Sequence, residues 1–106
     1  MLFRSRNSIS NTLANNQLKN NPGDGILLTN GDNNTVDRNE SNQNGTSATH
    51  AGIHADAASS GNILTDNNAF QNVTFDARDD NRPGNTWSGN HCRTDFPAGT
   101  ICENGK

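Results

Sequence analysis

The sequence predicts an all-β solenoid, a parallel coil of about four rungs, from three observations. A hexapeptide pattern of Asn, any residue, an apolar residue, any two residues and Asn begins at Asn11, Asn34, Asn62 and Asn85, with spacings of 23, 28 and 23 residues. A repeat of this length is typical of stacked units that bury their apolar faces against one another. Within each unit the apolar residues stand between polar ones, as in short strands with one buried face. More than half of the 106 residues are Asn, Asp, Gly, Ser or Thr, which suits a coil with many turns.

The first repeat predicts three short strands, which lie around Leu13, at Gln17–Lys19 and at residues 25–28. Turns rich in Asn and Gly separate them. The second repeat places strands at Val36 and at residues 51–55, and we assign its five extra residues to a polar insert at residues 40–49. Each repeat thus describes one rung, and successive rungs would lie about 4.8 Å apart.

The third repeat predicts strands at Leu64, at residues 69–70 and at residues 75–79, and the fourth at Trp87, at Cys92 and at residues 100–102. Aligning the rungs gives two inward columns of small and medium apolar side chains, which suit a narrow interior. One column is Leu13, Val36, Leu64 and Trp87, and the other is Ile26, Ile53, Ala77 and Ile101.

One asparagine recurs at the same turn of every rung, and these four are Asn16, Asn39, Asn67 and Asn90. Stacked amides can hydrogen-bond to the matching residue above and below, and Asn tolerates the left-handed backbone of tight corners. We therefore predict an asparagine ladder, with solvated turn residues as the alternative. Asn44 lies in the insert, where we expect a substitution to cost little stability.

The composition limits the classes of protein and partner. Fewer than one fifth of the residues are Leu, Ile, Val or Phe, which by itself would indicate disorder, but the net charge is only −3 and the apolar residues recur in phase. Eight basic residues with no basic stripe argue against nucleic acid. No apolar run is long enough for a membrane span, and the first seven residues do not form a secretion signal.

Cys92 and Cys102 are the two cysteines of the chain, and both fall in the last repeat. Two thiols near His91 are too few for a zinc site, so a disulfide that closes a small loop is the favoured interpretation. The acidic stretches lack the spacing of a calcium loop. We therefore expect no metal and no cofactor, and the disulfide implies an oxidising compartment.

The Asn-Thr-apolar pattern with Asn corners and Gly-Ile strand starts resembles the right-handed parallel β-helix repeat of the pectin-lyase-like superfamily. The segment from Phe75 to Cys102 is similar to the C-terminal end of secreted β-helix proteins, including relatives of the copper-processing periplasmic NosD group. The resemblance covers residues 7–102. It implies a right-handed β-helix, and it is unspecific for activity because this scaffold carries lyases, hydrolases, epimerases, adhesins and proteins without known chemistry.

Catalysis on this scaffold would use polar side chains that project outward from neighbouring rungs. The candidates are His54, Asp56, Asp76 and Arg78, expected beside Ile53 and Ala77 on one face. They could form an acid and base pair or a sugar-binding cluster. The alternative is an ordinary solvated surface, which the absence of Tyr favours.

The sequence therefore predicts an N-terminal lead-in at residues 1–10 and β-helix repeats with a C-terminal cap loop at residues 11–106. We expect a non-catalytic scaffold or binding segment of a secreted, cell-surface or periplasmic protein, associated with a polysaccharide or an extracellular protein. The alternative is a fragment of a polysaccharide lyase, hydrolase or epimerase. The first rung would expose Leu13, Leu18 and Ile26, so upstream rungs or end-to-end self-association are expected partners.

Overall fold

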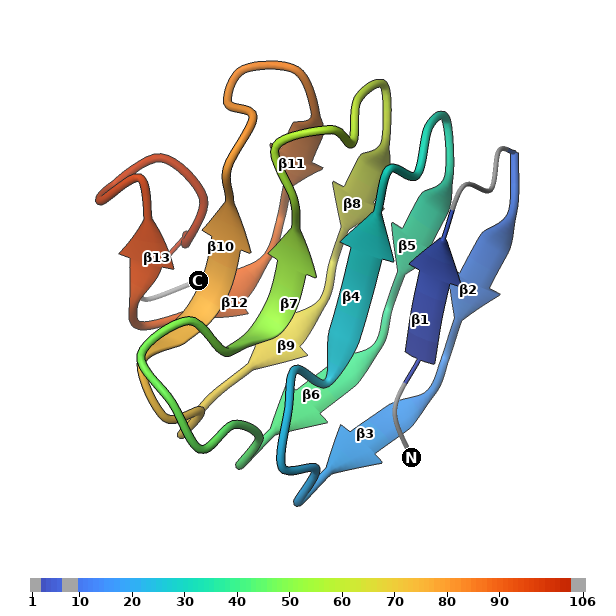
Figure 1. Ribbon diagram of the computed structural model, residues 1–106. Helices are drawn as coiled ribbons and strands as arrows, with labels where there is room; N and C mark the ends of the chain where they lie inside the picture. Colours follow the sequence, from blue (N-terminus) through green and yellow to red (C-terminus); the bar gives the residue numbers. More distant parts are fainter. Residues whose placement is uncertain (1–2, 7–9, 104–106) are drawn as a thin grey trace.

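A computed structural model describes residues 3–6 and 10–103, and their strands wind into a parallel β-helix of about four turns (Figure 1). Every regular element in these ranges is a β-strand. No described segment forms a helix that could cross a membrane. The predicted all-β solenoid is confirmed.

The strands form three parallel sheets, one along each side of the coil (Figure 1). The first sheet has the order β1 (Phe3–Arg6), β4 (Ile26–Thr29), β7 (Ala51–Ala55), β10 (Phe75–Asp79) and β13 (Asp95–Phe96). The second sheet has the order β2 (Thr12–Ala14), β5 (Thr35–Asp37), β8 (Ile63–Thr65) and β11 (Thr86–Ser88). The third sheet has the order β3 (Gln17–Lys19), β6 (Glu40–Asn42), β9 (Asn68–Ala69) and β12 (His91–Cys92).

The interior is filled mainly by small and medium apolar residues of the strands, and β4 and β7 each contribute two of them. The first predicted column is in register, with Leu13 paired to Val36, Val36 to Leu64 and Leu64 to Trp87. In the second column Ile26 pairs with Ile53, and Ile53 with Ala77. Full burial of such a side chain stabilises the fold by about 1.5–3 kcal/mol. The core residues are Leu13, Leu18, Ile26, Leu28, Val36, Ile53, Ala55, Leu64, Ala69, Ala77, Cys92 and Ile101.

The second column differs from the prediction at its last rung. Ala77 pairs with Asp95 of β13, and not with Ile101. The Asp95 carboxylate accepts hydrogen bonds from the backbone N–H groups of Ile101 and Cys102, each at 2.9 Å. These bonds fold residues 100–102 over the end of the coil, where Ile101 is buried against the core without forming a strand.

Two further expectations are corrected. Residues 40–42, assigned to a polar insert, form β6 and bury Ser41, so the longer connection of this rung begins later. Leu13, Leu18 and Ile26 are all buried, although we expected them to be uncovered at the first rung. Ile26 pairs with Phe3, because β1, within the expected lead-in, extends the first sheet by one strand.

Three asparagine ladders, one at each corner, run along the coil. Each ladder side-chain oxygen accepts the backbone N–H of the asparagine one rung earlier, and in most pairs its Nδ2 as well. The structure joins the predicted residues in this way, since Asn16 donates to Asn39, Asn39 to Asn67 and Asn67 to Asn90. The other two ladders are Asn11, Asn34, Asn62 and Asn85, and Asn21, Asn44 and Asn72.

Asn44 is therefore a fully buried ladder residue, and its expected place in a polar insert, the ground for a low cost of replacement, is wrong. Its Nδ2 donates to Leu18 O, Ser41 Oγ and Asn72 Oδ1, each at 3.1 Å. A buried amide without such partners would destabilise the fold, whereas here its bonds connect three neighbouring rungs.

The residue before every ladder asparagine except Asn85 takes a left-handed backbone conformation. At the second corner these residues are Asn15, Arg38, Asp66 and Gly89, with φ of 61°, 55°, 55° and 69°. Asn and Asp are suited to this conformation, because their short polar side chains bond locally. The third corner also needs glycine for close approach, since a Cβ on Gly25 would collide with Ser41 Oγ and Gly52 O.

Candidate functional site

The outward face of the first sheet carries one row of side chains that includes His54 and Arg78. Leu27 pairs with His54, His54 with Arg78, and Arg78 with Phe96, so each rung contributes one residue. Successive side chains of a strand point to opposite faces, and the neighbours of this row, such as Ile53 and Ala77, fill the core. Two of the four predicted candidates, His54 and Arg78, thus lie side by side.

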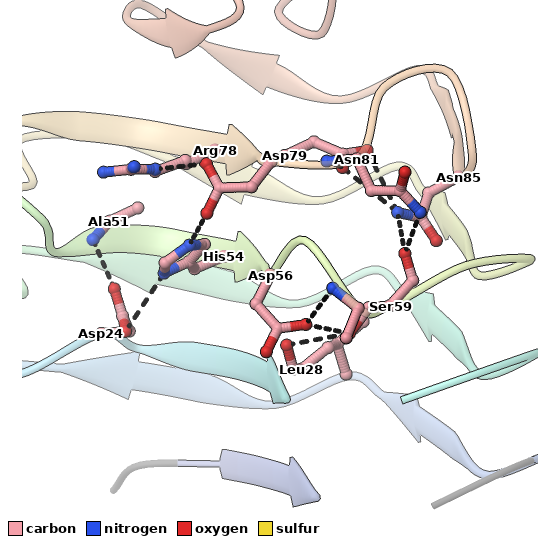
Figure 2. Close-up of polar contacts among 12 residues, drawn as sticks. Asp24, Leu28, Ala51, His54, Asp56, Ser59, Arg78, Asp79, Asn81 and Asn85 are labelled. Carbon is pink, nitrogen blue, oxygen red and sulfur yellow. Dashed lines mark hydrogen bonds and ion pairs between the residues drawn. The ribbon is translucent and has the colours of Figure 1, made fainter. Parts of the chain in front are cut away.

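His54 lies between two carboxylates that come from different rungs (Figure 2). Its Nε2 is 2.9 Å from Asp80 Oδ2, and its Nδ1 is 3.5 Å from Asp24 Oδ2, which is an ion pair rather than a good hydrogen bond. The side chain is only 13% exposed. Burial alone would lower the pKa of His54, but the two carboxylates outweigh it and raise the pKa.

Asp80 links His54 to Arg78. Its Oδ1 accepts a hydrogen bond of 2.7 Å from Arg78 Nε, and its Oδ2 faces the imidazole. Burial would raise the pKa of Asp80, but the hydrogen bonds and charges of His54 and Arg78 outweigh it and lower the pKa. Asp24 is held at the other side of His54 by the Ala51 N–H, at 2.5 Å. The result is a chain of polar contacts that runs across three rungs (Figure 2).

Two phenylalanines flank the guanidinium. The ring centroids of Phe75 and Phe96 are 5.7 Å apart and the rings are tilted by 51°. Arg78 Cζ lies 5.9 Å from the Phe75 centroid and 5.3 Å from the Phe96 centroid, within cation–π range. Phe96 is 43% exposed. We call His54, Phe75, Arg78, Asp80 and Phe96 the outer patch.

Asp76, the third predicted candidate, does not share this face. It is 3% exposed and points into the coil, where its Oδ1 accepts from Asn72 N at 3.1 Å and Asn72 Nδ2 at 3.0 Å. It therefore ends the third ladder in place of an asparagine. The expectation that Asp76 projects outward is wrong, because Asp76 and Ala77 are both buried and the strand does not alternate there.

Asp56, the fourth candidate, makes its hydrogen bonds within and around the turn after β7. Its carboxylate accepts from Asn30 N and Ala58 N, each at 3.1 Å. It also accepts from Ser59 Oγ at 2.8 Å (Figure 2). These bonds hold the turn against the preceding rung, and no contact joins Asp56 to His54 among the described residues. The predicted four-residue cluster is thus replaced by the outer patch.

The sequence pattern did not indicate Asp24 or the outer-patch residues Asp80, Phe75 and Phe96. Side chains two residues apart on a strand face the same side, so the alternation continued from Arg78 would have placed Asp80 on the same face. Phe96 was missed because the last strand was assigned to residues 100–102. Asp24 lies in a turn, and no periodic pattern indicates its position.

The two cysteines form the predicted disulfide, with Cα atoms 5.0 Å apart. It fixes the loop that carries Asp95 and Ile101 across the end of the coil. Burial would raise the pKa of Asp95, but hydrogen bonds from the backbone N–H groups of Cys102, Gly99, Ile101 and Thr100 outweigh it and lower the pKa. Beyond it, Glu103 bonds to Gly89 and Asn90 and closes the second corner.

Fold and site together define a small parallel β-helix with a disulfide-closed end and one chemically active face. The model of the NosD family, described as periplasmic copper-binding protein (NosD), matches residues 3–103. The match spans nearly the whole chain, and the protein belongs to this family. A search of curated proteins and a search of solved structures gave no match. Membership of a periplasmic family agrees with the localisation expected from the disulfide.

The family description names copper, and the described residues do not fit a copper site. Cys92 and Cys102 are joined to each other, and the ring nitrogens of His54 face carboxylates. His50 Nδ1 accepts the N–H of Thr46 at 3.0 Å. Within residues 3–6 and 10–103 no three His, Cys, Asp or Glu side chains are arranged to hold a metal ion.

Proposed function

We propose that this protein is a non-catalytic periplasmic β-helix that binds a polysaccharide through the outer patch. The observation that carries the proposal is the partly exposed Phe96 beside Phe75 and Arg78, on a flat sheet face. An aromatic ring offers an apolar surface to the C–H face of a sugar, while nearby polar groups fix its orientation by hydrogen bonds.

The contacts of His54 support a binding role over acid and base catalysis. A general base must reach a substrate proton with a free nitrogen, but both nitrogens of His54 face carboxylates. Asp24 is nearly buried, and Asp80 contacts both His54 Nε2 and Arg78 Nε. The polar groups of the cluster therefore bind one another and stabilise this face of the sheet. A lyase, hydrolase or epimerase would need a group that remains available.

Affinity gel electrophoresis with a panel of soluble polysaccharides tests the proposal. At least one polymer should retard the wild-type protein, and Phe96→Ala should abolish the retardation. Ile63→Ala is the matched control, since Ile63 is 48% exposed but lies on the second sheet. The polymer that binds should release no reducing ends or unsaturated sugars on incubation.

Three outcomes would contradict the proposal. The first is unchanged migration in every polymer, which would leave an extracellular protein as the partner to seek. The second is equal retardation of wild type and Phe96→Ala, which would place binding elsewhere. The third is product release that His54→Gln abolishes, which would favour the enzyme class.

A further inference from the structure

We propose that the outer patch selects an acidic sugar, one that carries a carboxylate, and that Arg78 is the residue that recognises it. This inference rests on the proposed function and names its ligand class. It follows from three features of the Arg78 side chain, which are its fixed orientation, its terminal nitrogens and the rings beside it.

The orientation of Arg78 is fixed from one side. Asp80 Oδ1 holds Nε at 2.7 Å, and Asp80 is itself held by His54 Nε2 at 2.9 Å. The side chain is 23% exposed, so the guanidinium reaches the surface without being free in solution. A preorganised arginine loses less conformational freedom on binding than a mobile one.

The terminal nitrogens of Arg78 make no hydrogen bond or ion pair to any residue that the structure describes, because its one such contact uses Nε. Two parallel N–H groups on a planar guanidinium match the two oxygens of a carboxylate. A neutral sugar could accept from one of these donors. A carboxylate can accept from two, and its negative charge also attracts the positive guanidinium.

The phenylalanines set where the carboxylate-bearing ring would lie. Phe96, at 5.3 Å from Arg78 Cζ and partly exposed, offers a surface next to the terminal nitrogens. A six-membered sugar ring stacked on Phe96 would place a substituent at its edge within reach of Arg78. The nearby carboxylate of Asp80 is already paired with Arg78 Nε at 2.7 Å, so part of its charge is compensated before a ligand arrives.

Isothermal titration of the full chain with three polymers tests the inference. The probes are a uronic-acid polymer, a neutral polymer of similar linkage and a sulfated polymer. Wild type should bind the uronic-acid polymer tightest. Arg78→Gln should weaken that binding by about tenfold or more and leave the neutral polymer unaffected. Arg78→Lys should recover only part of it, because an ammonium lacks the planar fork.

Arg38→Gln is the matched control, since Arg38 is an exposed arginine paired with Asp37 away from the first sheet. It should bind all three polymers like wild type. Unfolding curves followed by Trp87 fluorescence should establish that Arg78→Gln and Arg78→Lys are folded. If one variant is unfolded, the other still decides the result.

The outcomes separate this inference from the proposed function. One outcome overturns the inference alone. In it, wild type binds the neutral polymer as tightly as the uronic-acid polymer, and Phe96→Ala abolishes this binding but Arg78→Gln does not. Equal or tighter binding of the sulfated polymer overturns the carboxylate assignment. No binding to any polymer overturns both.

Discussion

Replacing Asn67 with Ala removes the side chain that joins three rungs at the second corner. Its Oδ1 accepts Asn39 N at 2.9 Å and Asn39 Nδ2 at 3.1 Å. Its Nδ2 donates to Val36 O at 3.0 Å and to Asn90 Oδ1 at 2.9 Å. Asn67 is 1% exposed, so water cannot replace these four bonds.

The expected loss follows from this count. A hydrogen bond contributes about 1 kcal/mol net, so the substitution should destabilise the fold by about 4 kcal/mol. Buried partners left without a bond, and the space left by the side chain, add to the loss. The free energy of unfolding of a domain of this size is about 5–15 kcal/mol, so Asn67→Ala should remain folded only marginally.

Urea unfolding followed by Trp87 fluorescence and far-ultraviolet circular dichroism measures the effect. Asn68→Ala is the matched control, because the neighbouring Asn68 faces outward and its side chain makes no hydrogen bond within the described residues. Asn16→Ala should fall between them, since its Nδ2 donates only to Ala14 O and Asn39 Oδ1. Equal stabilities of Asn67→Ala and Asn68→Ala would refute the reasoning.

Four further predictions follow from the same contacts. Asn44→Ala should destabilise the fold about as much as Asn67→Ala, with Gln43→Asn as the control in the unfolding assay. The pKa of His54 is raised in the folded protein, so protonated His54 stabilises the fold fully below pH 6.5, and this stabilisation is lost as the pH rises through the folded pKa. In urea unfolding at increasing pH, the free energy of unfolding of wild type should therefore fall relative to that of His54→Gln. Reduction of Cys92–Cys102 should lower the free energy of unfolding by about 2–3 kcal/mol, and an unchanged urea midpoint would contradict the role of the loop. End-to-end association stays a prediction, which light scattering tests: a monomer at every concentration would oppose it.

The sequence predicted the coil because the repeat and the inward columns are periodic. Asn16, Asn39, Asn67 and Asn90 could be assigned since each follows an apolar strand residue at constant spacing. The third ladder was missed although its members stand five residues after those of the second. Asn44 was assigned to a polar insert, because the length of its rung changes just beyond it. Composition alone does not distinguish a buried amide from a turn amide.

The candidate site was predictable only where the strands alternate regularly. His54 and Arg78 lie on regular strand positions, so period two placed both outward. Asp76 was misassigned because two successive residues of β10, Asp76 and Ala77, are both buried, so the strand does not alternate there. Asp24 comes from a turn, and its distance to His54 depends on how that turn folds over the sheet, which local patterns do not determine.

The ladders and the outer patch are coupled through β10. Asn72 holds Asp76 at 3.0 Å inside the coil, while Phe75 and Arg78 on the same strand face outward. The strand has only five residues, so its inner anchor also fixes the position of its outer side chains. Asp76→Ala should therefore weaken polysaccharide binding more than a substitution of equal stability cost at Asn16, which lies at the distant second corner. Equal loss of binding in variants matched for stability would show that the patch depends on global stability alone.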